Sequence, residues 1–161
     1  MAFLVWLHES DFAMWVSGSP SLWAYPTILT SHTLGMAILV GISAMIDLRI
    51  LGVGRQLALA PMERLYPLMW LGFWINAVSG SALFVADAVR KAENRVFYIK
   101  LVFVALAVVN MWLLRRRVFR HPGLDGAPLP MTARISAVTS LAFWTGAITA
   151  GRLMAYIGQP G

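Results

Sequence analysis

The stretch PTILTSHTLGMAILVG, from Pro26 to Gly41, decides how this chain folds. It lies within a longer run, from about Leu22 to Ile46, that contains no Asp, Glu, Lys or Arg. A transmembrane helix needs about 20 consecutive, mostly apolar residues, so this run is long enough to cross a bilayer. Its single histidine is His32, and ionisable groups of this kind inside membrane helices are costly and usually functional.

The composition of the whole chain indicates an integral membrane protein. Of 161 residues, 59% are hydrophobic and 12% are charged, and the mean hydropathy is +0.70. A soluble domain of this size carries more charge. The net charge of +6 comes from basic residues in short connections between apolar runs. That pattern is typical of membrane topology, so we expect contact with the lipid bilayer and no nucleic-acid partner.

Four apolar runs have the length of a membrane span. They lie at about residues 22–46, 65–86, 96–114 and 135–157. The connections between them are short, which favours antiparallel neighbours. The sequence therefore predicts an all-α integral membrane protein with a single membrane domain of residues 1–161, in which four transmembrane helices form an up-down-up-down bundle.

The amino-terminal segment MAFLVWLHESDFAMWVSGSP differs from these runs. It has no basic start, and Glu9 and Asp11 interrupt its apolar residues, so it does not match a signal peptide. Its spacing predicts a short interfacial helix at about residues 1–18 that lies on the outer surface of the membrane.

The distribution of Arg and Lys predicts the orientation. The first and third connections hold most of the arginines: Arg49, Arg55, Arg64, Arg115, Arg116, Arg117, Arg120 and Arg134. By the positive-inside rule these connections are cytoplasmic, and both termini face the periplasm or exterior.

This orientation brings ionisable residues from several spans to one depth. His32 lies roughly 9 Å below the outer boundary, and Lys100, Arg152 and Asp87 belong to the same outer portion. Two buried cations need anions, and the propionates of haem b would supply them. His32 would then be an axial ligand of the haem iron, and Gly35, one turn later, would leave space for a flat ring.

Simpler roles remain open for these residues. His32 could make an interhelical hydrogen bond or bind another metal or a proton. Lys100 and Arg152 could instead extend to the interface or pair with Asp87 and the acidic residues near the amino terminus.

The metal-ligand inventory is small. The chain has no cysteine, which excludes disulfides, thiolate sites and iron–sulfur clusters within it. His8 is the candidate second haem ligand, whereas His121 lies in a basic loop. His8 with Glu9, Asp11 or Met14 could also hold copper or zinc, although no repeated ligand spacing supports such a site.

The segment HTLGMAILVGISAMIDLRILG, His32–Gly52, resembles a family of small bacterial four-helix membrane proteins. The shared pattern is an intramembrane histidine, a following glycine and an Asp-Leu-Arg motif at residues 47–49. FYIKLVFVALAVVN at 97–110 and GRLMAYI at 151–157 extend the resemblance. It implies the fold and a bacterial inner (cytoplasmic) membrane, and no activity. The architecture is also similar to small b-type cytochromes.

Two residues within these motifs are interpreted structurally. Asp47, with Arg49, is expected to pair at the helix end, and Asn110 to make an interhelical hydrogen bond.

The leading hypothesis is a haem b-binding membrane protein for electron transfer or for redox or gas sensing near the outer face. It would need a redox partner, and its small-residue faces favour a homo-oligomer. The alternatives are an oligomeric transporter or channel-like component and a structural or assembly subunit of a membrane complex. We assign no catalytic residue, because nucleophile–base spacing, a phosphate-binding loop and paired carboxylates within a span are all lacking.

Overall fold

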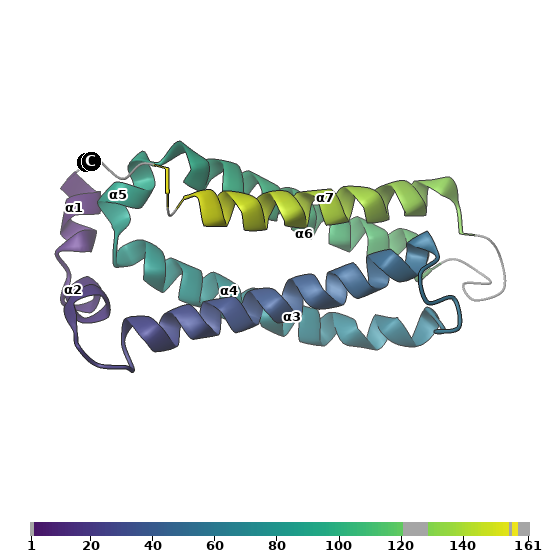
Figure 1. Ribbon diagram of the computed structural model, residues 1–161, viewed down its shortest axis with the longest axis horizontal. Coiled ribbons are helices and arrows are strands. Elements are labelled where there is room, and N and C mark those ends of the chain that lie inside the picture. Colours follow the sequence, from purple (N-terminus) through teal and green to yellow (C-terminus); the bar gives the residue numbers. More distant parts are fainter. Residues whose placement is uncertain (1, 121–128, 155, 158–161) are drawn as a thin grey trace.

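The computed structural model describes residues 2–120, 129–154 and 156–157. These residues form helices and connecting turns with no strand, which confirms the all-α prediction. Consecutive long helices run antiparallel along one common direction (Figure 1). The long helices are α3 (Tyr25–Leu51), α4 (Tyr66–Val85), α6 (Arg95–Val118) and α7 (Met131–Leu153).

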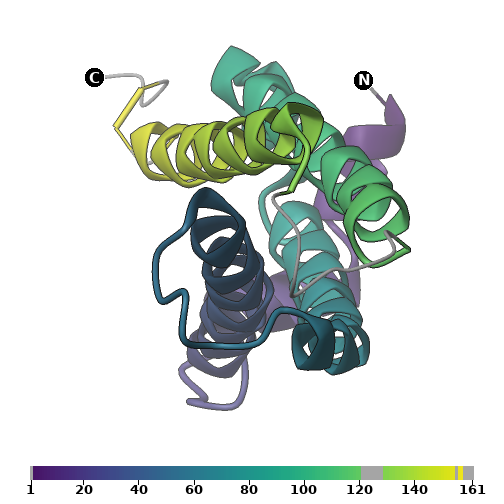
Figure 2. The ribbon, with the colours of Figure 1, turned by 90° about the vertical axis from the view of Figure 1, so that its right-hand side faces the viewer.

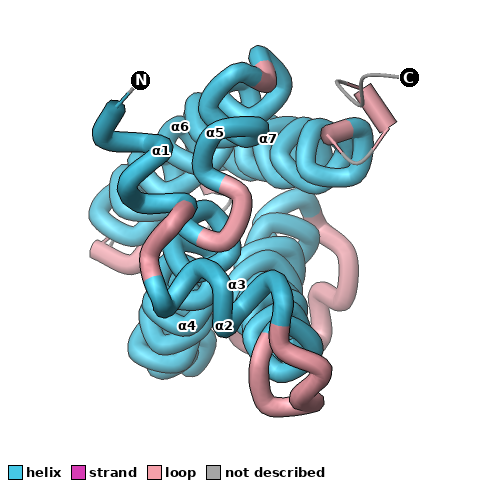
Figure 3. Tube along the Cα trace, turned by 90° about the vertical axis from the view of Figure 1, so that its left-hand side faces the viewer, coloured by secondary structure: helices cyan, strands magenta, loops and turns pink. Residues whose placement is uncertain are grey.

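Short helices occupy both ends of this arrangement. One end of the bundle, where α1, α2 and α5 lie across the long helices, is called the α5 end (Figure 3). The other end, where the 3-10 helix η1 precedes α4, is called the η1 end. The bounds of the short helices are Ala2–His8 for α1, Asp11–Gly18 for α2, Ala60–Leu65 for η1 and Ala88–Glu93 for α5.

The prediction of one interfacial helix at residues 1–18 is wrong in detail, because two short helices occupy the segment. The Ser10 hydroxyl accepts a hydrogen bond from the Ala13 N–H at 3.2 Å, so Ser10 caps the start of α2. A cap satisfies the first backbone donors of a new helix, and here it separates α1 from α2. The helix α5 was not predicted, since its residues were interpreted as a connection.

Three helical segments of the described chain are long and apolar enough to cross a membrane. They are Tyr25–Leu51, Ala60–Val85 and Arg95–Val118. The fourth expected span, 135–157, is not among them. Its helix, α7, begins earlier, ends at Leu153, and contains two arginines and several Ser, Thr and Gly residues that lower its hydropathy.

The long helices associate as two pairs. α3 packs along α4, α6 packs along α7, and the α3–α7 contact joins the two pairs (Figure 2). The apolar core lies in the half nearer the η1 end. Its buried members include Leu39, Ile46, Ile50, Tyr66, Met69, Met111, Leu114, Val118 and Trp144.

α3 and α4 approach closely where two glycines face each other. A Cβ atom added at Gly35 would lie 2.8 Å from the Asn76 nitrogen and 2.9 Å from the Gly72 oxygen. A Cβ atom added at Gly72 would lie 2.9 Å from the Gly35 oxygen. Real Cβ atoms do not tolerate such distances to backbone, so the crossing requires glycine on both helices.

We expect Gly35→Ala to destabilise the protein by about 1–3 kcal/mol, because the new methyl group must push α3 and α4 apart. Gly41→Ala is the matched control: it lies on the same helix with no atom within 4 Å of an added Cβ. Unfolding by SDS titration in detergent would measure the difference, and equal stability of the two variants would contradict the close crossing.

Candidate functional site

His32 is the centre of a polar contact between α3 and α4. Its Nδ1 lies 3.0 Å from the backbone oxygen of Asn76 and 3.2 Å from the Ser79 hydroxyl oxygen. In return, the Asn76 side-chain amide donates to the His32 backbone oxygen at 2.8 Å. Since a backbone oxygen only accepts, Nδ1 carries the proton and Nε2 has the free lone pair. Nε2 makes no hydrogen bond to any part of the chain that the structure describes.

The imidazole is also fixed by its packing against α4. A Cβ atom at Gly80 would lie 2.9 Å from the His32 Cε1, so the ring occupies the space that a side chain at residue 80 would need. The Ser79 hydroxyl donates to the Ile75 oxygen at 2.5 Å, which leaves its oxygen available as an acceptor for Nδ1–H. α4 therefore holds the ring through Nδ1 and packs against it at Cε1.

Two lysines from other helices act electrostatically on this imidazole. They are Lys100 of α6 and Lys91 of α5. The Lys100 side chain runs beside α7, where its Cδ and Nζ lie 3.6 and 3.8 Å from the position of a Cβ at Gly151. The Lys91 ammonium donates to the backbone oxygen of Leu83.

Lys91 is influenced by a carboxylate and by other cations. Burial lowers the pKa of Lys91, the Asp87 carboxylate opposes that shift, and the charges of Lys100 and Arg90 add to it. Neither lysine forms a salt bridge among the described residues. The Asp87 carboxylate pairs instead with Arg90, at 2.7 Å. We call His32, Lys91 and Lys100 the cationic site.

Arg152 does not join the cationic site, although the sequence placed it at the same depth. Its side chain is exposed, and it forms no salt bridge within the described chain. Lys91 supplies the second cation. Lys91 was not predicted as a site residue, because residues 87–95 were interpreted as a connection. Asn94 marks the start of α6, since its side chain accepts a hydrogen bond from the Val96 N–H.

Gly35 does not provide the space that was expected of it. Backbone atoms of α4 fill the volume beside its Cα, so no flat ring fits there. Its role in the structure is the close helix crossing.

His8 lies apart from His32. It is exposed at the end of α1, which packs against α5. Among the described residues no three His, Cys, Asp or Glu side chains come together, so the copper or zinc site considered around His8 is not found there. His121 lies outside the described residues.

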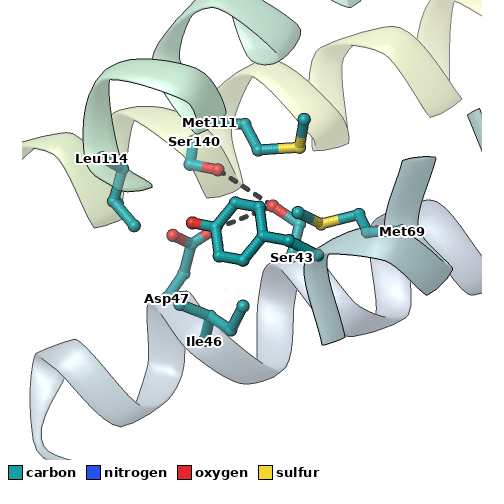
Figure 4. Close-up of a pocket in the computed structure, with 8 residues that line it drawn as sticks. Ser43, Ile46, Asp47, Met69, Met111, Leu114 and Ser140 are labelled. Carbon is teal, nitrogen blue, oxygen red and sulfur yellow. Dashed lines mark hydrogen bonds between the residues drawn. The ribbon is translucent and has the colours of Figure 1, made fainter. Parts of the chain in front are cut away.

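Asp47 is placed differently from its prediction. It was expected to pair at a helix end, but it is only 1% exposed and lies in the core among Ser43, Ser140 and Tyr66 (Figure 4). Arg49 instead donates to the Leu57 backbone oxygen. The sequence signals for a buried carboxyl were Ser43, one turn before it, and the serines of the fourth apolar run.

The interhelical role of Asn110 is confirmed. Its side-chain amide donates to the Ser136 backbone oxygen at 2.8 Å, which joins α6 to α7.

Comparisons with protein-family models, curated proteins and solved structures found no match for this chain. The resemblance to small bacterial four-helix membrane proteins therefore stays an expectation.

We expect Asn76→Ala to cost roughly 0.6–1.7 kcal/mol of stability, because it removes the interhelical hydrogen bond to the His32 oxygen. Ser81→Ala is the control, since that exposed hydroxyl bonds only within its own helix, to the Ala77 oxygen at 2.9 Å. SDS-induced unfolding followed by tryptophan fluorescence would compare them. An Asn76→Ala variant as stable as Ser81→Ala would show that the contact contributes nothing.

Proposed function

We propose that this chain is a haem b-binding protein of the bacterial inner membrane that uses His32 as an axial ligand. The observation that carries the proposal is the state of the imidazole. Nδ1 is held by the Asn76 oxygen at 3.0 Å, while Nε2 is unbonded in the described structure. Histidines that ligate metals commonly donate their other nitrogen to a carbonyl or carboxylate, which fixes the ring and raises its basicity.

The charges around His32 suit the same ligand. Haem b carries two propionates, and the cationic site supplies two ammonium groups, Lys91 and Lys100, that form no salt bridge among the described residues. Charge-assisted hydrogen bonds from these groups would offset the cost of burying the lysines. The residues present thus match the group in ligand type and in charge.

With His32 as its one protein ligand, the haem iron would be suited to sensing or to one-electron chemistry. Haem b would supply a one-electron redox centre and an axial position for a small molecule. Within the described chain, no contact joins His8 to His32, so the surroundings of His32 contain no second histidine. A role in redox or gas sensing follows more directly than bis-histidine electron transfer.

The decisive test is the visible spectrum of protein purified in mild detergent after haem-replete expression. We expect a Soret band and, after dithionite reduction, an α band. The haem content should be near one haem per chain. His32→Ala should abolish both bands, while His8→Ala, on the exposed α1, should retain them. A colourless wild type, or full haem retention in His32→Ala, would contradict the proposal.

The same proposal includes four membrane crossings, with α7 as the fourth. α7 is about as long as α6, packs along α6 and α3, and buries seven of its residues against them. These neighbours would shield Ser136 and Ser140 from lipid, whereas the hydroxyls of Thr139 and Thr145 donate to backbone oxygens of α7 itself. Both termini would then lie on the periplasmic side, with the arginine-rich connections in the cytoplasm.

The absence of cysteine makes this topology simple to test. Single cysteines at three exposed positions, Glu9→Cys, Gln56→Cys and Tyr156→Cys, would be treated with a membrane-impermeant maleimide. We expect the first and third to react in spheroplasts and the second only after lysis. Reaction of Tyr156→Cys only after lysis would show that α7 does not cross.

A further inference from the structure

A second polar site lies in the core, in the half of the bundle nearer the η1 end. The Ser43 hydroxyl donates to Oδ2 of Asp47 at 3.4 Å and lies 3.4 Å from the Ser140 hydroxyl (Figure 4). Both distances exceed the usual 2.7–2.8 Å of an O–H···O hydrogen bond. Ser43 therefore makes only long contacts with the other two oxygens.

These oxygens border a small cavity. Its volume is about 10 Å³, and its polar lining comes from Ser43, Asp47, Tyr66 and Ser140. Apolar side chains of α3, α4 and α6 complete the wall. A volume of this size is about that of one water-sized occupant. Trp144 donates its indole N–H to the Ser43 hydroxyl at 3.0 Å and so fixes one of the lining groups.

The site holds a carboxyl group with no cation beside it. Asp47 is 1% exposed, and it takes part in no salt bridge of the described chain. Arg115 of α6 lies over the Tyr66 ring at 5.0 Å and pairs with Glu63 at 3.3 Å. Hydroxyl groups do not cancel a full charge, so an ionised carboxylate here requires one positive charge.

We propose that the Asp47 cavity binds one small monovalent cation, for which Na⁺ is the test ligand. The oxygens of the Asp47 carboxylate and of the lining hydroxyl groups are hard ligands, which suit hard cations. One carboxylate balances one charge, whereas Ca²⁺ takes six to eight oxygen ligands, often with several carboxylates. The cavity admits a single water-sized ion.

The surrounding groups suggest the route of entry. Tyr66 is 1% exposed and separates the cavity from Arg115 and Glu63, which are both partly exposed toward the η1 end. A cation would pass the Glu63–Arg115 pair and the Tyr66 ring to reach Asp47. The cavity lies in the other half of the bundle from His32, so this inference does not depend on haem binding.

The test compares thermal unfolding in detergent at fixed pH in NaCl and in choline chloride of equal ionic strength. We expect Na⁺ to stabilise the wild type in a saturable way. At ten times its Kd, the ion lowers the unfolding constant about elevenfold. Asp47→Asn, which keeps the shape and removes the charge, should lose the response, and Ser43→Ala and Ser140→Ala should shift it to higher Na⁺ concentration.

Asp87→Asn is the matched control, because Asp87 pairs with Arg90 outside the cavity. It should keep the wild-type response. A second measurement uses only the wild-type protein: the ²³Na NMR line should broaden when Na⁺ binds, and no variant has to fold. Equal unfolding in both salts without line broadening would overturn the proposal. A response to pH alone, lost in Asp47→Asn, would also overturn it and assign a proton to the cavity.

Discussion

The close crossing of α3 and α4 is the constraint on which the rest of the arrangement depends. Gly35 and Gly72 bring the two backbones together, and the reciprocal His32–Asn76 bonds hold them in register. In lipid, burial of apolar surface does not drive helices together, so close packing and interhelical hydrogen bonds set which faces meet. With this pair fixed, α3 presents His32 near one end and Asp47 near the other.

The two polar sites are opposite in charge and separate in position. The cationic site gathers His32, Lys91 and Lys100, which form no salt bridge in the described chain, whereas Asp47 is buried and also forms none there. Their separation along α3 prevents direct compensation between them. The two proposals therefore give each site an external ion of the opposite sign, an anion near the α5 end and a cation near the η1 end.

Several features were predictable because they depend on local composition. The helices α3, α4 and α6 follow from uncharged or nearly uncharged apolar runs, and the Asn110 hydrogen bond from a single amide in such a run. The break between α1 and α2 depends on one cap at Ser10. The helix α5 is a short segment between the longer helices α4 and α6. Such short elements carry little periodicity, so the sequence did not separate them from connections.

The sequence by itself determined an all-α chain with apolar helices of membrane length, and it singled out His32 and Lys100. Only the tertiary structure decided that Lys91 and not Arg152 joins them, that Gly35 serves the crossing, and that Asp47 lies in the core. The physical reason is that hydropathy fixes the depth of a residue, whereas the rotation of each helix about its axis decides which neighbour its side chain meets. That rotation is set by packing between helices distant in sequence.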